Sequence, residues 1–145
     1  MTHKTTAPLG LAVAAVLAGS AGPAVACRYN APAEERVRRD YDAVVVATVT
    51  ASTYGVWHRG AERPSWQATG RSERLVKGAA PSGDYAFGRS GASAACDDGQ
   101  PAPRVGERWV LYLQAVEGRV HVTQSYPLTL AETIDPRFGA AVDRP

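Results

Sequence analysis

The stretch that decides the fold is Asp42-Ala43-Val44-Val45-Val46-Ala47-Thr48-Val49-Thr50. β-Branched side chains dominate it, and such side chains fit the pleated surface of a β-strand. Working outward from this stretch, residues rich in aromatic and β-branched side chains alternate with turns that contain Gly or Pro. Four more strands are therefore expected, at residues 65–77, 84–88, 108–113 and 119–123.

The strand expected at residues 65–77 is irregular. Trp66, Ala68 and Gly70 fall on one face, but Leu75 breaks the alternation. An extra residue in one strand shifts the alternation in this way, so we expect a β-bulge near Ser72. The core residues expected to be buried on these strands are Val44, Val46, Trp66, Trp109 and Leu111.

The rest of the pattern is short and turn-rich. Asn30 is placed to cap a short helix over residues 30–41, with Pro32 in its first turn. Glu117 and Gly118 form a hairpin turn, and residues 128–142 are weakly helical or irregular. Together these features predict an all-β domain, a small five-stranded OB-like antiparallel barrel with a short N-terminal helix. The alternative is a β-sandwich, which normally has about seven strands.

The N-terminus has the features of a secretory signal peptide over residues 1–26. Lys4 is followed by an apolar run at residues 9–18 and by Ala24-Val25-Ala26, an A-x-A cleavage site. The apolar run is shorter than the roughly 20 residues that cross a bilayer, which argues against the alternative of a membrane anchor. The expected mature chain is one domain over residues 27–145, exported to the periplasm or the medium. Lipidation at Cys27 is a further alternative, although Ala24 stands where lipoprotein signals usually have Leu.

Two cysteines, Cys27 and Cys96, are present. In an oxidising compartment such a pair predicts a disulfide, whereas two separate thiols would need a reducing compartment. A bond between them would close a loop of 69 residues and, in the loop-entropy account, stabilise the fold by roughly 4 kcal/mol.

Charge and motif content favour a binding protein over an enzyme. Without Lys4, 15 of the 16 Lys and Arg remain against 14 Asp and Glu, a balance that argues against nucleic-acid binding. Phosphate loops, nucleophile elbows and spaced metal ligands are absent from the sequence, so we expect no cofactor and no catalytic residue. His58 and His121 are expected to be solvated, and Asp97-Asp98-Gly99 to form a turn rather than a calcium site. An enzyme with an unrecognised site remains an alternative.

Several short motifs occur in a recognisable order. They are Cys27 before a helix, Asp42-Ala43-Val44-Val45-Val46-Ala47, Arg74-Leu75-Val76-Lys77-Gly78, Cys96, and Gly106-Glu107-Arg108-Trp109-Val110-Leu111-Tyr112. From residue 27 to about residue 126 the chain resembles the bacterial relatives of the tissue inhibitors of metalloproteinases, which share the netrin-like OB-fold. The resemblance implies an OB-type barrel whose N-terminal segment is pinned by a Cys27–Cys96 disulfide.

The resemblance also implies a working surface. In the inhibitors, the amine and carbonyl of the first cysteine chelate the catalytic zinc of the target protease. By this analogy the candidate partner-binding residues are Cys27, Arg28, Tyr29 and Asn30, joined by Trp57 in a long loop. Cys27 would ligate a partner's zinc, and no metal would be bound in isolation.

The chain departs from the inhibitors in three respects. It lacks the second cysteine of their Cys-x-Cys start, it carries Arg28 where they have a small residue, and it has cysteines for one disulfide only. We therefore expect an exported, non-enzymatic binding module, with metalloproteinase inhibition as a sub-case. The alternative is a structural or envelope-associated protein without a dedicated ligand, attached to a membrane only if Cys27 carries a lipid.

Overall fold

Strands make up most of the ordered structure. The computed structural model describes residues 31–57, 59, 63–91 and 98–139 of the chain. All five expected strands are present, most of them longer than expected. In chain order the elements are α1 (Ala33–Val37), β1 (Ala43–Tyr54), β2 (Trp66–Gly78), β3 (Asp84–Arg89), β4 (Arg108–Val116), β5 (Arg119–Pro127), α2 (Leu128–Ile134) and α3 (Pro136–Gly139).

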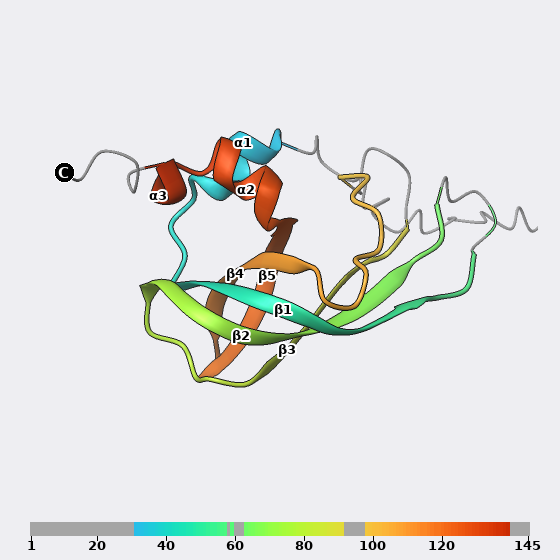
Figure 1. Cartoon of the computed structure of the whole chain (residues 1–145), viewed down its shortest axis with the longest axis horizontal. Helices are drawn as coiled ribbons and strands as arrows, with labels where there is room; N and C mark the ends of the chain where they lie inside the picture. The colour runs from blue at the N-terminus through green and yellow to red at the C-terminus, as the bar shows by residue number, and fades with distance from the viewer. Residues whose placement is uncertain (1–30, 58, 60–62, 92–97, 140–145) are drawn as a thin grey trace, which may run out of the picture.

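The five strands form one antiparallel sheet in the order β3-β2-β1-β4-β5. The strand with the decisive Val-rich stretch, β1, is thus the central strand (Figure 1). The outer strands β3 and β5 are not paired with each other, so the sheet does not close into a complete barrel. They still approach each other, because the Arg89 guanidinium on β3 donates to Ser125 on β5. The prediction of an OB-like antiparallel fold is confirmed in this partly open form, and the sandwich is excluded.

Bulges curve the long β1–β2 pair. Val46 faces Arg74 and Ala47 faces Ser72, so Glu73 is an extra residue on β2. This is the bulge expected near Ser72. Bulges bend a strand and increase its twist, and the curvature lets both faces of β1 become buried.

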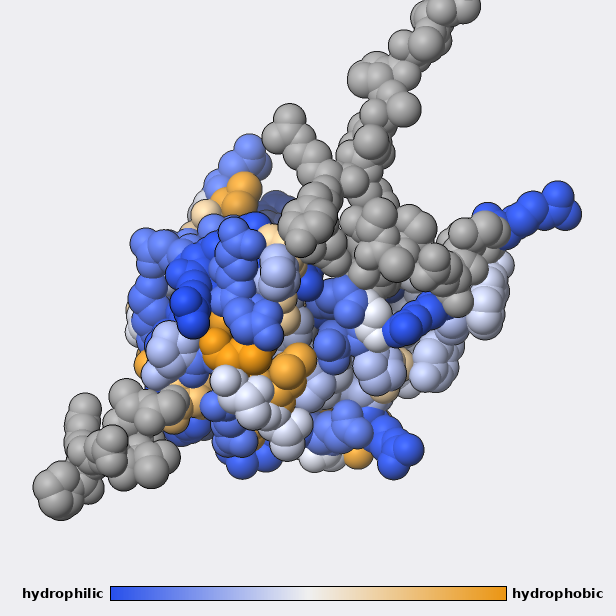
Figure 2. Space-filling view, turned by 90° about the horizontal axis from the view of Figure 1, so that it is seen from above, coloured by the Kyte–Doolittle hydropathy of each residue, from blue (hydrophilic) through white to orange (hydrophobic). Residues whose placement is uncertain are grey.

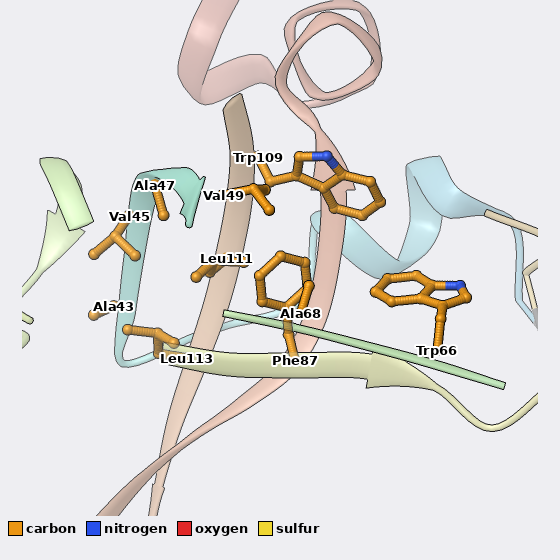
Figure 3. Packing of buried hydrophobic residues seen from close by; sticks show 10 residues of the cluster. All are labelled: Ala43, Val45, Ala47, Val49, Trp66, Ala68, Phe87, Trp109, Leu111 and Leu113. Atoms are coloured by element: carbon orange, nitrogen blue, oxygen red, sulfur yellow. The ribbon is translucent and has the colours of Figure 1, made fainter. Parts of the chain in front are cut away.

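Two apolar clusters fill the two sides of the sheet. The first contains Val45, Ala47, Leu111 and Leu113 around three rings in edge-to-face and tilted contact, Trp66, Phe87 and Trp109 (Figure 3). Ring centroids in this trio lie 5.5–6.0 Å apart. The second cluster lies beneath the helices and holds Val37, Tyr41, Val44, Val46, Val110, Tyr112, Tyr126, Leu128 and Ala131. All five predicted core residues are buried, as expected.

The N-terminal helix is shorter than expected. It begins at Ala33 behind Pro32, which makes no side-chain cap, and Asn30 lies outside the described residues. Two contacts hold the chain after the helix in a non-helical path toward β1. The Tyr41 hydroxyl donates to the Arg36 carbonyl at 2.7 Å, and the Lys77 ammonium donates to the Tyr41 carbonyl at 2.8 Å. Tertiary contacts therefore override the helical pattern of residues 38–41.

The C-terminal helices lie beside α1 on the same side of the sheet (Figure 1). The weakly helical pattern expected over residues 128–142 is confirmed as far as Gly139 by α2 and α3, and residues 140–142 lie outside the described residues. Their position depends on Asp135, whose buried carboxylate accepts from the Tyr112 hydroxyl at 2.9 Å and from Arg137 Nε at 2.9 Å. In the ranges that the structure describes, no helix is long and apolar enough to cross a membrane.

Candidate partner-binding surface

Three large apolar side chains are exposed where β1 ends. Tyr54, Val56 and Trp57 are 67%, 74% and 61% exposed, and we call them the apolar tip. Trp57, which the sequence suggested as a partner-binding residue, is thus exposed, and its role in binding stays a prediction. An exposed group of large apolar side chains is unusual. The aromatic side chains of the first cluster, Trp66, Phe87 and Trp109, are by contrast buried.

The strand pairing explains why the tip is exposed. Strand β1 pairs with β4 only as far as Thr48, whereas its pairing with β2 continues to Tyr54 opposite Trp66. Two more hydrogen bonds, between Val49 and residues 106 and 107, end the contact on the β4 side. Beyond them β1 has β2 on one side and, within the described ranges, no strand on the other. Its last residues therefore extend past the core (Figure 1).

A groove runs beside the tip. Its lining comes from Ser52 and Tyr54 on β1, from residues 101–109, which include the exposed Val105, and from Leu128 and Glu132 on α2. Its lining combines apolar, hydroxyl and charged groups. Such a mixed lining suits a protein partner better than a small apolar ligand.

A buried ionic cluster connects the loop after Cys96 to the rest of the domain. Arg89 binds Asp98 with two hydrogen bonds, from Nε to Oδ1 at 2.8 Å and from Nη2 to Oδ2 at 2.9 Å. Arg36 of α1 approaches the same carboxylate, with Nη1 3.7 Å from Oδ2. The Asp98 and Arg89 side chains are only 5% and 13% exposed. One carboxylate thereby joins α1, β3 and the segment that begins at residue 98.

The surroundings of this carboxylate favour its charged form. Burial acts to raise the pKa of Asp98, but the hydrogen bonds and charge of Arg89 outweigh burial, aided by the Gln100 amide and by Arg36. The pKa of Asp98 therefore lies below its usual range. Trp66 supports the same loop, because its indole Nε1 donates to the Gln100 carbonyl at 3.0 Å.

Arg89 and Arg36 differ in the number of partners that stabilise their charges. Arg89 also donates to Ser125 and lies 5.4 Å from the Trp66 ring centroid. Arg36 lies 5.7 Å from the Tyr126 ring centroid, and its buried Nε has no hydrogen-bond partner among the described residues. Among the described residues the cluster has two cations and one anion, so Asp98 provides their charge compensation.

Most of the residues proposed from the resemblance fall outside the described part of the chain. These are Cys27, Arg28, Tyr29, Asn30 and Cys96, together with His58. The disulfide therefore stays a prediction. The ion pair of Arg36 with Asp98 nevertheless joins the helix that follows the Cys27 segment to the residue two positions after Cys96.

The structure also describes His121 and the side chains that could hold a metal ion. His121 is exposed on β5, as expected. Within the described ranges, no three His, Cys, Asp or Glu side chains are grouped to hold a metal ion. Tyr54 and Val56 were not among the predicted site residues, and Asp98 was expected in an ordinary turn. An acidic residue in a loop of small residues was the available signal, but it does not identify distant arginine partners.

The chain was also compared with known proteins. No protein-family model, no curated protein and no solved structure matches it.

Proposed function

We propose that the mature chain is an exported, non-enzymatic binding module of the netrin-like OB type, which contacts a protein partner. Its contact surface would combine the apolar tip with the N-terminal segment Cys27–Asn30. The observation that carries the proposal is the exposure of Tyr54, Val56 and Trp57 together at one end of the sheet. Exposed apolar groups of this kind mark interaction sites, and Trp and Tyr are enriched among residues that dominate binding energy.

The rigid support of the loop after Cys96 favours such a role. Asp98 is held by Arg89 and Arg36, and Gln100 is held by Trp66. A contact surface mounted on a fixed loop loses less conformational entropy when a partner binds. If Cys96 is bonded to Cys27, the same support extends to the N-terminal segment.

Metalloproteinase inhibition is the sub-case with a defined mechanism. The freed amine and the carbonyl of Cys27 would bind the zinc of the protease, since both are zinc donors. Arg28 would then enter a pocket that is apolar in most such proteases, and an unpaired buried charge is strongly unfavourable. We therefore expect no useful inhibition of matrix-type metalloproteinases by the wild type, but better inhibition by an Arg28→Thr variant. A target with an acidic pocket would instead favour Arg28.

The assay is residual peptidase activity with the mature wild type, with Arg28→Thr, and with a form that carries one additional Ala before Cys27. The extra residue removes the amine from the position in which it can bind zinc. Loss of inhibition by the Ala-extended form supports the mechanism. If that form inhibits as well as its parent, the amine is not a ligand and the inhibitor-like mechanism is wrong.

The alternative of a structural or envelope-associated protein differs in its covalent state. Lipidation would attach a diacylglycerol to Cys27, whereas the binding module starts with a free Cys27 amine. The intact mass of the exported protein distinguishes the two forms. A lipid adduct would exclude the zinc-binding mechanism, because the amine of a lipidated cysteine is held at a membrane.

A further inference from the structure

A basic hollow lies at the opposite end of β1 from the apolar tip. It is formed where the chain leaves α1, where β2 ends, and where α3 begins, and its volume is about 500 Å³. Four of its side chains are cations: Arg38, Arg39, Lys77 and Arg137. Two carboxylates, Asp40 and Asp135, also belong to it.

The carboxylates in the hollow are already engaged. Asp135 is fully buried and accepts from Arg137 Nε at 2.9 and 3.1 Å. Asp40 is paired with Lys77, with Nζ 2.5 Å from Oδ1. The hydrogen bond and the charge of Lys77 lower the pKa of Asp40, which is therefore ionised at neutral pH. These pairs fix the positions of Lys77 and Arg137 but do not use Arg38 and Arg39.

Arg38 and Arg39 carry the positive charge that exceeds the two carboxylates of the hollow. Both side chains are exposed, and among the described residues the structure records no ion pair for either one. They follow each other in the turn between α1 and β1, while Lys77 is held 2.8 Å from the Tyr41 carbonyl close by. The face of the molecule seen from above is mostly hydrophilic, with a few apolar residues among the polar ones (Figure 2). Two guanidinium groups thus border the hollow, and in the part of the chain that the structure describes no carboxylate is paired with them.

We propose that this hollow binds a phosphate group. The planar guanidinium fork matches the oxygens of phosphate and can donate two parallel hydrogen bonds to it. Arg38 and Arg39 make the direct contacts, and Lys77 and Arg137, fixed by their carboxylate partners, form the base of the hollow. The phosphate can belong to a free anion or to the headgroup of an anionic lipid. This inference is independent of the proposed function, since the hollow and the apolar tip lie at opposite ends of β1.

Two probes distinguish the two sources of phosphate. Inorganic phosphate is titrated into the ¹⁵N-labelled mature domain, and the Arg Nε resonances are followed by NMR. Sedimentation with phosphatidylglycerol vesicles, against phosphatidylcholine vesicles, measures lipid binding. Shifts with inorganic phosphate identify a free-anion site, and binding to phosphatidylglycerol vesicles without such shifts identifies a headgroup site. Either result supports binding at the hollow only if the variants described next change the affinity as expected.

The test variant is Arg38→Gln with Arg39→Gln, and the matched control is Arg104→Gln with Arg119→Gln. Both pairs remove two charges from exposed arginines, so the net charge changes equally. We expect the test variant to bind the responding probe about tenfold or more weakly, since each basic residue near an anionic surface contributes on the order of a fivefold change in affinity. The control should bind within about twofold of the wild type.

A third variant tests the sign of the local field. Asp40→Asn removes the one exposed carboxylate of the hollow, whose side chain is 97% exposed, so the core is not affected. It should bind more tightly than the wild type. The proposal is overturned if neither probe binds, if the control weakens binding as much as the test variant, or if Asp40→Asn weakens it.

Discussion

Replacing Asp98 by Asn tests whether the buried ionic cluster holds the loop after Cys96. The substitution keeps the size of the side chain and removes its charge. Arg89 then loses its charged acceptor at 2.8 and 2.9 Å, and Arg36 loses the carboxylate at 3.7 Å. Within the described ranges, two guanidinium groups then remain without a compensating carboxylate, one of them with an unpaired Nε.

The magnitude follows from the burial of the pair. Removing one partner of a buried ion pair lowers the free energy of unfolding by about 3–5 kcal/mol, because the other charge is left uncompensated. We expect about 3 kcal/mol for Asp98→Asn, since the amide can still accept one hydrogen bond. For a domain of this size the melting temperature should fall by roughly 10 °C or more.

The chain offers a matched control in Asp84. Its carboxylate accepts two hydrogen bonds from Arg71, at 2.9 and 3.3 Å, in the same bidentate arrangement. Here the side chains are 47% and 68% exposed, so water replaces the lost carboxylate. Asp84→Asn should leave the unfolding transition almost unchanged.

Acid should remove the difference between wild type and Asp98→Asn. Because the pKa of Asp98 is lowered in the folded state, its contribution is present above about pH 4 and is lost as the pH falls below 3.8. Urea unfolding, followed by circular dichroism between pH 7 and pH 2, measures this. If Asp98→Asn is no more destabilising than Asp84→Asn at pH 7, the cluster does not hold the loop and the reasoning is refuted.

Three further predictions concern the core, the C-terminal helices and the cysteines. Trp109→Ala should lower the free energy of unfolding by about 3–5 kcal/mol, because the side chain is 1% exposed between Trp66 and Phe87. A loss below about 1 kcal/mol in urea unfolding would mean that Trp109 lies at the surface. Tyr112→Phe should lower the free energy of unfolding by about 1–3 kcal/mol, because it removes a donor to buried Asp135. Unchanged proteolysis of α2 and α3 in this variant would contradict the prediction. Cys96→Ala should lower stability by about 2–5 kcal/mol in the oxidised protein, and alkylation of two thiols without reductant would exclude the disulfide.

The strands could be predicted from the sequence because their signals are local. The Val-rich run of residues 42–50 and the Trp66–Gly70 alternation need no knowledge of distant residues. Even the bulge at Glu73 is visible in the misplaced Leu75. Apart from the β4–β5 hairpin at Glu117 and Gly118, the order of the strands was not predicted, since pairing joins segments far apart in the chain.

The ends of elements and the candidate site were harder to predict, because distant contacts decide them. Arg36, Arg89 and Asp98 meet only after folding, and no short motif connects them. Similarly, Tyr54 belongs to a strand but is exposed, because β4 leaves the side of β1 near Val49. A periodic pattern shows which face of a strand can be buried, but not where the neighbouring strand ends.

The most direct test of the proposed function is capture of a partner from the native periplasm or medium by the immobilised mature domain. The tip variant is Tyr54→Ser with Trp57→Ser, and the control is Val116→Ser, another exposed apolar residue near the opposite end of β1. Mass spectrometry compares the captured proteins, and the affinity of any protein enriched on the wild type is then measured with each purified variant. The account predicts a partner that binds the wild type and the control with equal affinity and binds the tip variant at least tenfold more weakly. Equal binding to all three forms, or no specific partner for the wild type, would contradict it.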